Sequence, residues 1–190
     1  MRSKIVRLYE PSDIRTVLRQ SLTNNGHANS RHELIGDGYA TAPHIRLADM
    51  RKRILGGGPN VSSFRNCLPD AIAFALRKGS GQRALTVLAK PETIYVFACV
   101  SIKDGGFRMV RYSKHDLVLN ADGKDFMPES GSRLSFARPE IEIADVLAIK
   151  LMVTPDDDLH IRTAFPIRSG EKILGIEARD KDGTEHFYPE

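Results

Sequence analysis

His44 occupies a position where a histidine can act on phosphate, immediately before a segment with helical spacing, residues 45–55. The free N–H groups and the positive dipole end of a helix N-terminus favour an anion and lower the pKa of an imidazole nearby. Arg46, Asp49 and Arg53 follow on one face of this helix, at spacings of three and four residues. The pattern predicts acid–base chemistry at a phosphate group. The plain alternative is a half-exposed histidine on a basic surface helix.

A second candidate lies in the segment DDDLHIRTAFP, residues 156–166, where an alternating stretch follows the aspartates and ends at a proline. Side chains of a strand point alternately to its two faces. One face is predicted to carry Leu159, Ile161, Thr163 and Phe165, and the other His160, Arg162 and Ala164. Thr163 and Phe165 either fill the core or supply a hydroxyl for a phosphate and a ring on which a base stacks.

Cys67 and His115 point to a different enzyme class. Cys67 stands just before a predicted helix, residues 69–79, and His115 begins a predicted strand with carboxylates beyond it. A cysteine at a helix N-terminus, with a histidine and an acid on later strands, is the arrangement of papain-like hydrolases. A buried structural cysteine is the alternative for Cys67. For the whole chain, the alternative to an enzyme is a non-catalytic RNA-binding module.

Motifs for several other chemistries are missing from the sequence. The six histidines form no HExxH pattern, and Cys67 and Cys99 form no CxxC pair, so neither a metal nor another cofactor is expected. Cys99 lies in an apolar run and is expected to be a buried thiol. No apolar run approaches the roughly 20 residues that span a bilayer, and the N-terminus has no apolar signal-peptide core.

Charge is distributed unevenly along the chain. Residues 1–92 hold 15 Lys and Arg against 7 Asp and Glu, a net charge of +8. Residues 93–190 hold 13 Lys and Arg against 17 Asp and Glu, a net charge of −4. A basic lobe attracts phosphate-rich partners such as nucleic acid. The alternative is an ordinary solvated surface on a basic protein.

The predicted secondary structure, which must position these residues, changes near residue 93 from mainly helices to strands. Before it, residues 4–9 are predicted to form a strand, and helices are predicted at residues 11–22, 45–55 and 69–79. Ser12 or Asp13 is expected to cap the first helix. After residue 93, hairpins are predicted from strand pairs 93–102 with 107–113, 115–119 with 124–127, and 146–153 with 159–165.

The order of these elements predicts an α+β protein. N-terminal helices should pack on a C-terminal antiparallel sheet, in a single domain that spans residues 1–190. Residues 172–188 are expected to add a hairpin at the edge of the sheet.

Four motifs follow one another along the chain. They are a histidine with a short helix ending in Arg-Ile (residues 44–54), a small-small-Phe turn (VSSF, 61–64), an Ala-rich helix (DAIAFAL, 70–76) and a strand pair closing in Thr-Ala-Phe-Pro (146–166). In this order they resemble the ribonuclease A-like toxin domain at the C-terminal tips of bacterial contact-dependent growth inhibition proteins. The similar region covers about residues 40–166, between an N-terminal strand, helix and loop (1–39) and a C-terminal edge hairpin (167–190).

The resemblance implies metal-independent RNA cleavage in a kidney-shaped, ribonuclease A-like fold. The catalytic residues that it implies are His44, Arg53, Thr163 and Phe165. Arg51 is the alternative to Arg53, and His32, in the loop before His44, is the first candidate for a second catalytic histidine. His160 and His115 are weaker candidates for that role and are expected to be strand-surface residues. The residues expected to contact RNA are Arg46, Arg51, Lys52 and Arg162.

The same resemblance implies a biological setting. The chain would be a secreted or delivered toxin that cuts RNA, chiefly tRNA, in the cytoplasm of a recipient bacterium. The producing cell would need a cognate immunity protein, and an acidic one fits the basic lobe. Neither DNA nor a membrane is expected as a partner.

Overall fold

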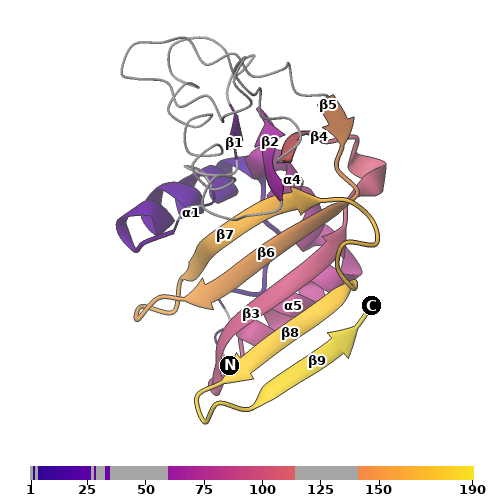
Figure 1. Cartoon of the computed structure of the whole chain (residues 1–190). Helices are drawn as coiled ribbons and strands as arrows, with labels where there is room; N and C mark the ends of the chain where they lie inside the picture. The colour runs from indigo at the N-terminus through magenta and orange to yellow at the C-terminus, as the bar shows by residue number, and fades with distance from the viewer. Residues whose placement is uncertain (1, 3, 27, 29–32, 35–59, 114–140) are drawn as a thin grey trace, which may run out of the picture.

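The computed structural model describes residues 2, 4–26, 28, 33–34, 60–113 and 141–190. These residues form three α-helices, a short 3₁₀ helix and nine strands in two sheets (Figure 1). The described part of the chain is therefore α+β, as the sequence predicts.

Helix α1, Pro11–Thr23, confirms the first predicted helix. Its N-cap is Glu10 rather than the predicted Ser12 or Asp13, because Pro11 is suited to the first turn, where its missing N–H is not needed. Asp13 stands three residues after the N-cap, and its Oδ2 accepts the backbone N–H of Glu10 at 2.9 Å to complete a capping box. The buried side chains of α1 are Ile14, Val17, Leu18 and Ser21.

Two helices follow one another in the middle of the chain. α4, Leu68–Arg77, confirms the predicted helix at residues 69–79, whereas α5, Gly79–Leu88, was not predicted. Lys78 is extended and separates them, serving as the C-cap of α4 and the N-cap of α5. A Cβ atom at Gly81 would lie 2.0 Å from the carbonyl oxygen of Ala75. Only glycine therefore lets the first turn of α5 fold back on the last turn of α4.

Residues 4–9 form turns and bends instead of the predicted strand. Ile5 and Tyr9 are buried there. The Arg2 guanidinium donates to the carbonyl oxygens of Leu88, at 3.1 Å, and Thr93, at 2.9 Å. These contacts tie the segment to the end of α5, where helix carbonyls need partners from outside the helix, and to the first residue of β3.

The larger sheet has five antiparallel strands in the order β7-β6-β3-β8-β9. Their bounds are β3 Thr93–Ser101, β6 Val146–Val153, β7 Leu159–Ile167, β8 Gly175–Asp180 and β9 Glu185–Pro189. The hairpin of β6 with β7 and the edge hairpin of β8 with β9 are confirmed, because short turns of Pro, Asp and Gly mark both in the sequence.

The smaller sheet has the order β1-β2-β4-β5. Its strands are β1 Glu33–Leu34, β2 Asn60–Arg65, β4 Arg108–Ser113 and β5 Ile141–Ile143. The pair of β1 with β2 is parallel and the other two pairs are antiparallel. The predicted turn VSSF is wrong, since these residues lie inside β2 and pair with β4.

The predicted hairpin of residues 93–102 with 107–113 is also wrong. β3 already has β6 and β8 on its two edges, so β4 cannot pair with it. A 3₁₀ turn, Lys103–Gly105, followed by Gly106 at φ 63°, redirects the chain into the smaller sheet. The predicted elements at 45–55, 115–119 and 124–127 lie outside the described residues.

The helices pack on one face of the larger sheet. α5 contacts β3 and β8, α4 lies between α1 and α5, and α1 packs against β7 (Figure 1). The main core thus formed draws on all three helices and both sheets. Its side chains include Ile14, Leu18, Phe64, Ile72, Leu85, Val96, Ala98, Val100, Met109, Ile149 and Leu151.

The opposite side of the larger sheet is called the open face below. Since Val96 and Ala98 of β3 enter the main core, the alternate residues Tyr95, Phe97 and Cys99 point to the open face. Their cross-strand partners follow from the registers and are Met152, Lys150 and Ala148 on β6, and Arg179, Glu177 and Gly175 on β8. This face combines aromatic rings with charged side chains.

Candidate functional site

Strand β7 contains a β-bulge at Arg162. Its cross-strand pairs with β6 are Phe165 with Ala148, Ala164 with Ile149, Thr163 with Lys150, Ile161 with Leu151 and His160 with Met152. The register shifts between Lys150 and Leu151, so Arg162 has no partner on β6. A bulge of this kind interrupts the alternation of side chains along a strand.

The predicted shared face of β7 is therefore only half correct. Leu159 and Ile161 belong to the main core, and after the bulge Ala164 takes the core-facing position. Thr163 and Phe165 do share a face, but it is the open face. There Phe165 packs against a small apolar cluster. The buried members of this cluster are Cys99, Val146, Ala148 and Ile167.

Thr163 presents a hydroxyl without a hydrogen-bond partner. Its Oγ1 is buried and bonds to no other group in the described part of the chain. Leaving a buried hydroxyl unpaired costs about 1–3 kcal/mol. The residue across the strand pair is Lys150, whose Nζ lies 3.8 Å from the centre of the Tyr95 ring. Thr163 and Lys150 therefore occupy neighbouring positions of the open face, and a hydroxyl and an ammonium are both groups that bind an anionic oxygen.

His160 lies on the same face, just before the bulge. It pairs with Met152, which shares a face of β6 with Lys150. The expectation of a strand-surface residue is wrong for His160, since its side chain is only 6% exposed. Its Nδ1 is buried and has no hydrogen-bond partner among the described residues.

The surroundings of His160 favour its neutral form. Burial lowers the pKa of His160, and the nearby charge of Arg162 lowers it further. The imidazole is therefore uncharged at neutral pH and able to accept a proton. Together with Thr163, it gives β7 two buried polar atoms that have no hydrogen-bond partner among the described residues.

The Arg162 side chain forms a hydrogen bond within the protein. Its guanidinium donates to the backbone carbonyl of Asn25, just after α1. Next to it, the backbone N–H of Ile161 donates to Ser21 Oγ of α1 at 3.0 Å. Two contacts thus connect the bulge to α1 and to the residue Asn25 just after it. The RNA contact expected of Arg162 stays a prediction.

Two of the four motifs, separated by about a hundred residues, lie side by side. Ser62 Oγ, in VSSF on β2, donates to the carbonyl oxygen of Pro166, in TAFP on β7, at 2.5 Å. β2 is in contact with β7 along this stretch. The smaller sheet therefore borders the end of β7 that carries Phe165 (Figure 1).

Two ion pairs connect the same sheets. Arg111 of β4 pairs with Glu171, and Arg168 binds Glu142 of β5 through two hydrogen bonds, of 2.7 and 2.5 Å. Bidentate pairs of this type fix geometry as well as charge. They hold the chain after β7 against the smaller sheet.

The predicted site residues His32, His44, Arg46, Arg51, Lys52 and Arg53 lie outside the described residues, and so does His115. Their roles remain predictions. The structure adds Lys150, and it places His160, a weaker candidate in the sequence, on the same face as Thr163. Motif spacing could not show this shared face, because it depends on the bulge at Arg162.

Cys67 is confirmed as a residue just before a helix, since it is the N-cap of α4. Its Sγ donates a hydrogen bond to the carbonyl oxygen of Arg108 at 3.4 Å. A carbonyl acceptor binds the protonated thiol and repels a thiolate, which is the form that a cysteine nucleophile requires. This contact counts against the papain-like alternative. Cys99 is a free and buried thiol, as predicted.

Within the described ranges, no group of three or more His, Cys, Asp or Glu side chains is arranged to hold a metal ion. No helix in these ranges is long and apolar enough to cross a membrane. The chain matches no protein-family model, and no curated protein or solved structure is detectably similar to it.

Proposed function

We propose that this protein is a metal-independent endoribonuclease whose nucleophile is the 2′-hydroxyl of RNA. The observation that carries the proposal is the arrangement on β7, where the unpaired Thr163 hydroxyl lies opposite Lys150 and shares the open face with Phe165. A hydroxyl, an ammonium and a ring on one face can bind a phosphate and the base next to it.

RNA cleavage needs few protein groups, because the substrate carries its own nucleophile. A base removes the 2′-hydroxyl proton, the O2′–P bond forms, the P–O5′ bond breaks, and an acid protonates the leaving 5′-oxygen. The products are a 2′,3′-cyclic phosphate and a 5′-hydroxyl. Cationic and hydrogen-bonding groups stabilise the negative phosphorane between these two steps.

The residues can be assigned to these roles. His160 acts as the base, because its lowered pKa keeps the imidazole neutral. Thr163 and Lys150 bind the phosphate oxygens. His44 acts as the acid, with His32 as the alternative. The phosphate is also held by Arg53, or by Arg51 in its place, as the resemblance implies.

The biological role is part of the proposal. The resemblance to growth-inhibition toxins and the basic N-terminal half support an antibacterial toxin that cuts tRNA in a recipient cytoplasm. On this view, the two described sheets and their helices belong to a kidney-shaped, ribonuclease A-like fold. An acidic immunity protein that covers the basic half would silence the toxin in the producing cell.

Incubation of the purified protein with total RNA in EDTA tests the proposed activity. We expect cleavage by the wild type, and a loss of about tenfold or more with Lys150→Met, since a charge-assisted contact contributes about 1.5–3 kcal/mol. Lys78→Met is the matched control, because Lys78 also lies over a ring, that of Phe74 at 4.8 Å, but on the helical side. Intact RNA with the wild type, or equal losses in both variants, would contradict the assignment.

The same assay separates the rival functions. A non-catalytic RNA-binding module would retain RNA without cutting it. A cysteine hydrolase would leave RNA intact and lose its own activity with Cys67→Ser.

A further inference from the structure

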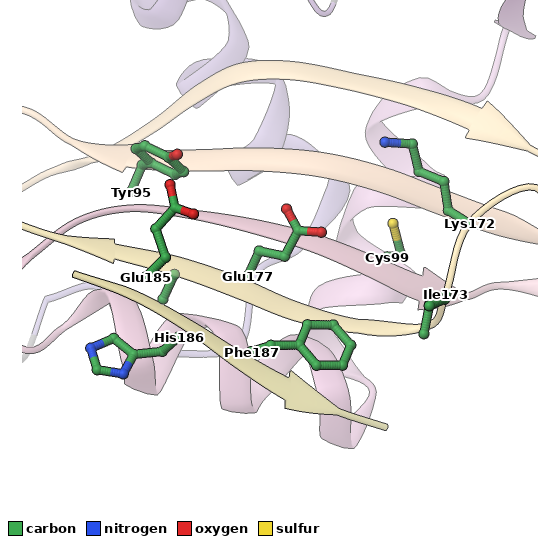
Figure 2. A pocket seen from close by; sticks show the side chains of 9 residues that line it. Tyr95, Cys99, Lys172, Ile173, Glu177, Glu185, His186 and Phe187 are labelled. Carbon is green, nitrogen blue, oxygen red and sulfur yellow. The ribbon is translucent and has the colours of Figure 1, made fainter. Parts of the chain in front are cut away.

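The open face is hollowed between β3, β8 and β9, in a region that the proposed cleavage does not use (Figure 2). The cavity has a volume of about 520 Å³. Its floor contains Cys99, and its walls carry Tyr95, Phe187, Glu177 and Lys172. Figure 2 shows the carboxylate of Glu177 projecting from β8 into the middle of these side chains.

Small residues explain why the hollow exists. Gly175 is the partner of Cys99 across the strand pair, so neither position fills the space above the sheet. A Cβ atom at Gly175 would lie 3.0 Å from Cζ of Phe187, and the backbone there has φ 147°. The glycine thus allows the Phe187 ring to lie over the sheet as a wall of the cavity. Half of the Phe187 side chain remains exposed.

The Cys99 thiol on the floor of the cavity is not a reactive group. Burial raises the pKa of Cys99 to about 11, with the charges of Lys172 and Glu177 acting in opposite directions. The thiol is therefore protonated at neutral pH and serves as a small apolar surface. The charged groups above it decide what the cavity binds.

Rings on this face already bind cations. Lys150 Nζ lies 3.8 Å from the centre of the Tyr95 ring, and Lys172 Nζ lies 4.7 Å from that of Phe97. Phe187 is directly opposite Glu177 in the register of β8 with β9. No cation of the described chain lies over the Phe187 ring, and none pairs with Glu177. An exposed ring next to an unpaired carboxylate is therefore left open to a ligand cation.

The balance of charge also favours a cation. The second carboxylate of the cavity, Glu185, forms a long ion pair with Arg179, at 3.9 Å, and is largely exposed. Residues 141–190, which supply β8 and β9, hold 11 Asp and Glu against 6 Lys and Arg. Among the side chains that line the cavity, the carboxylates of Glu177 and Glu185 outnumber the single ammonium of Lys172.

We propose that this cavity is a binding site for a guanidinium group. A planar guanidinium can stack on the Phe187 ring and donate two parallel N–H bonds to the Glu177 carboxylate, which a compact ammonium cannot do. Its source is either an arginine side chain of a partner protein or a small free guanidine. The inference does not rest on the proposed ribonuclease activity.

Titration of the full chain with N-acetylarginine amide, followed by NMR of the Phe187 ring and the amides of β8 and β9, tests the site. We expect saturable shifts there, and none with the neutral isostere N-acetylcitrulline amide. Glu177→Gln should weaken binding by about tenfold, and Phe187→Leu by about threefold, as expected for the loss of a charge-assisted bond and of a cation–π contact. Both positions are exposed, so circular dichroism should show an unchanged fold.

Asp182→Asn is the control variant, because this exposed carboxylate of the β8–β9 turn accepts the N–H of Thr184, as an asparagine also can. It should bind like the wild type. Equal shifts with citrulline, or full binding by Glu177→Gln, would overturn the proposal. A parallel titration with agmatine distinguishes the sources: tighter binding of the acetylated amide supports a protein arginine, and tighter binding of agmatine supports a free guanidine.

Discussion

Replacing Thr163 by valine should make the protein more stable and less active at once. Valine keeps the branched shape of threonine and removes Oγ1, which is buried without a partner in the described structure. Since a buried unpaired hydroxyl costs about 1–3 kcal/mol, its removal should raise the free energy of unfolding by about 1 kcal/mol. For a chain of this size, that corresponds to a rise in Tm of about 2–4 °C.

The Thr163→Val variant should cleave RNA more slowly, although its fold should be more stable. If the hydroxyl donates to a phosphate oxygen in the transition state, its loss should slow cleavage by about ten- to a hundredfold, or about 1.4–2.7 kcal/mol at the barrier. Thermal and urea unfolding measure the first effect. Initial rates on an end-labelled RNA measure the second.

Thr93→Val provides the matched control, because Thr93 is also a buried threonine of the larger sheet. Its Oγ1 donates to Asp180 Oδ1 at 3.0 Å, so the valine removes one partner of this carboxylate, whose other oxygen contacts His186 Nε2 at 2.9 Å. We expect a loss of about 1 kcal/mol in stability with no effect on cleavage. The reasoning is refuted if Thr163→Val is destabilised like the control and cleaves RNA like the wild type.

Three further predictions concern other residues. Burial lowers the pKa of His160 below its ordinary value of 6.5, so the unfolded chain takes up a proton first as the pH falls. Wild-type stability should therefore be fully present above pH 6.5 and decline toward the folded-state pKa. His160→Gln should flatten this decline in urea unfolding, and an unchanged pH profile would count against the buried neutral histidine. Phe165→Leu should raise KM for RNA more than it lowers kcat, because stacking acts in both ground and transition states. A loss confined to kcat would argue against a stacking platform. Cys67→Ser should retain RNA cleavage, since serine can still donate to the Arg108 carbonyl; a folded but inactive variant would favour the cysteine hydrolase.

Local patterns in the sequence predicted the elements that depend on local chemistry. α1 and α4 follow from helical spacing, and the two C-terminal hairpins follow from their Pro, Asp and Gly turns. α5 was missed because Gly79 and Gly81 indicate a break, whereas Gly81 is needed for close approach to α4. Its stability comes from packing on β3 and β8, which no local pattern reports.

The errors in the predicted strand pairing and in the predicted faces of β7 come from pairings between residues that are distant in the sequence. The partner of β4 depends on the occupied edges of β3, and the outward direction of Thr163 depends on a bulge against β6. Composition gives no sign of such a bulge, because the added residue, Arg162, also fits a regular strand. The sequence therefore identified Thr163 and Phe165 as a pair on one face, and was wrong in placing Leu159 and Ile161 on that face with them.

Analysis of the cleaved ends of a single RNA tests the central claim most directly. An oligonucleotide with one preferred cut is incubated with the protein in EDTA, beside a copy that carries a 2′-deoxy sugar at the cut. The proposed mechanism predicts a 2′,3′-cyclic phosphate and a 5′-hydroxyl from the first, and no cut at that position in the second, because the nucleophile is missing. Cleavage of the 2′-deoxy copy, or a strict need for added magnesium, would contradict it.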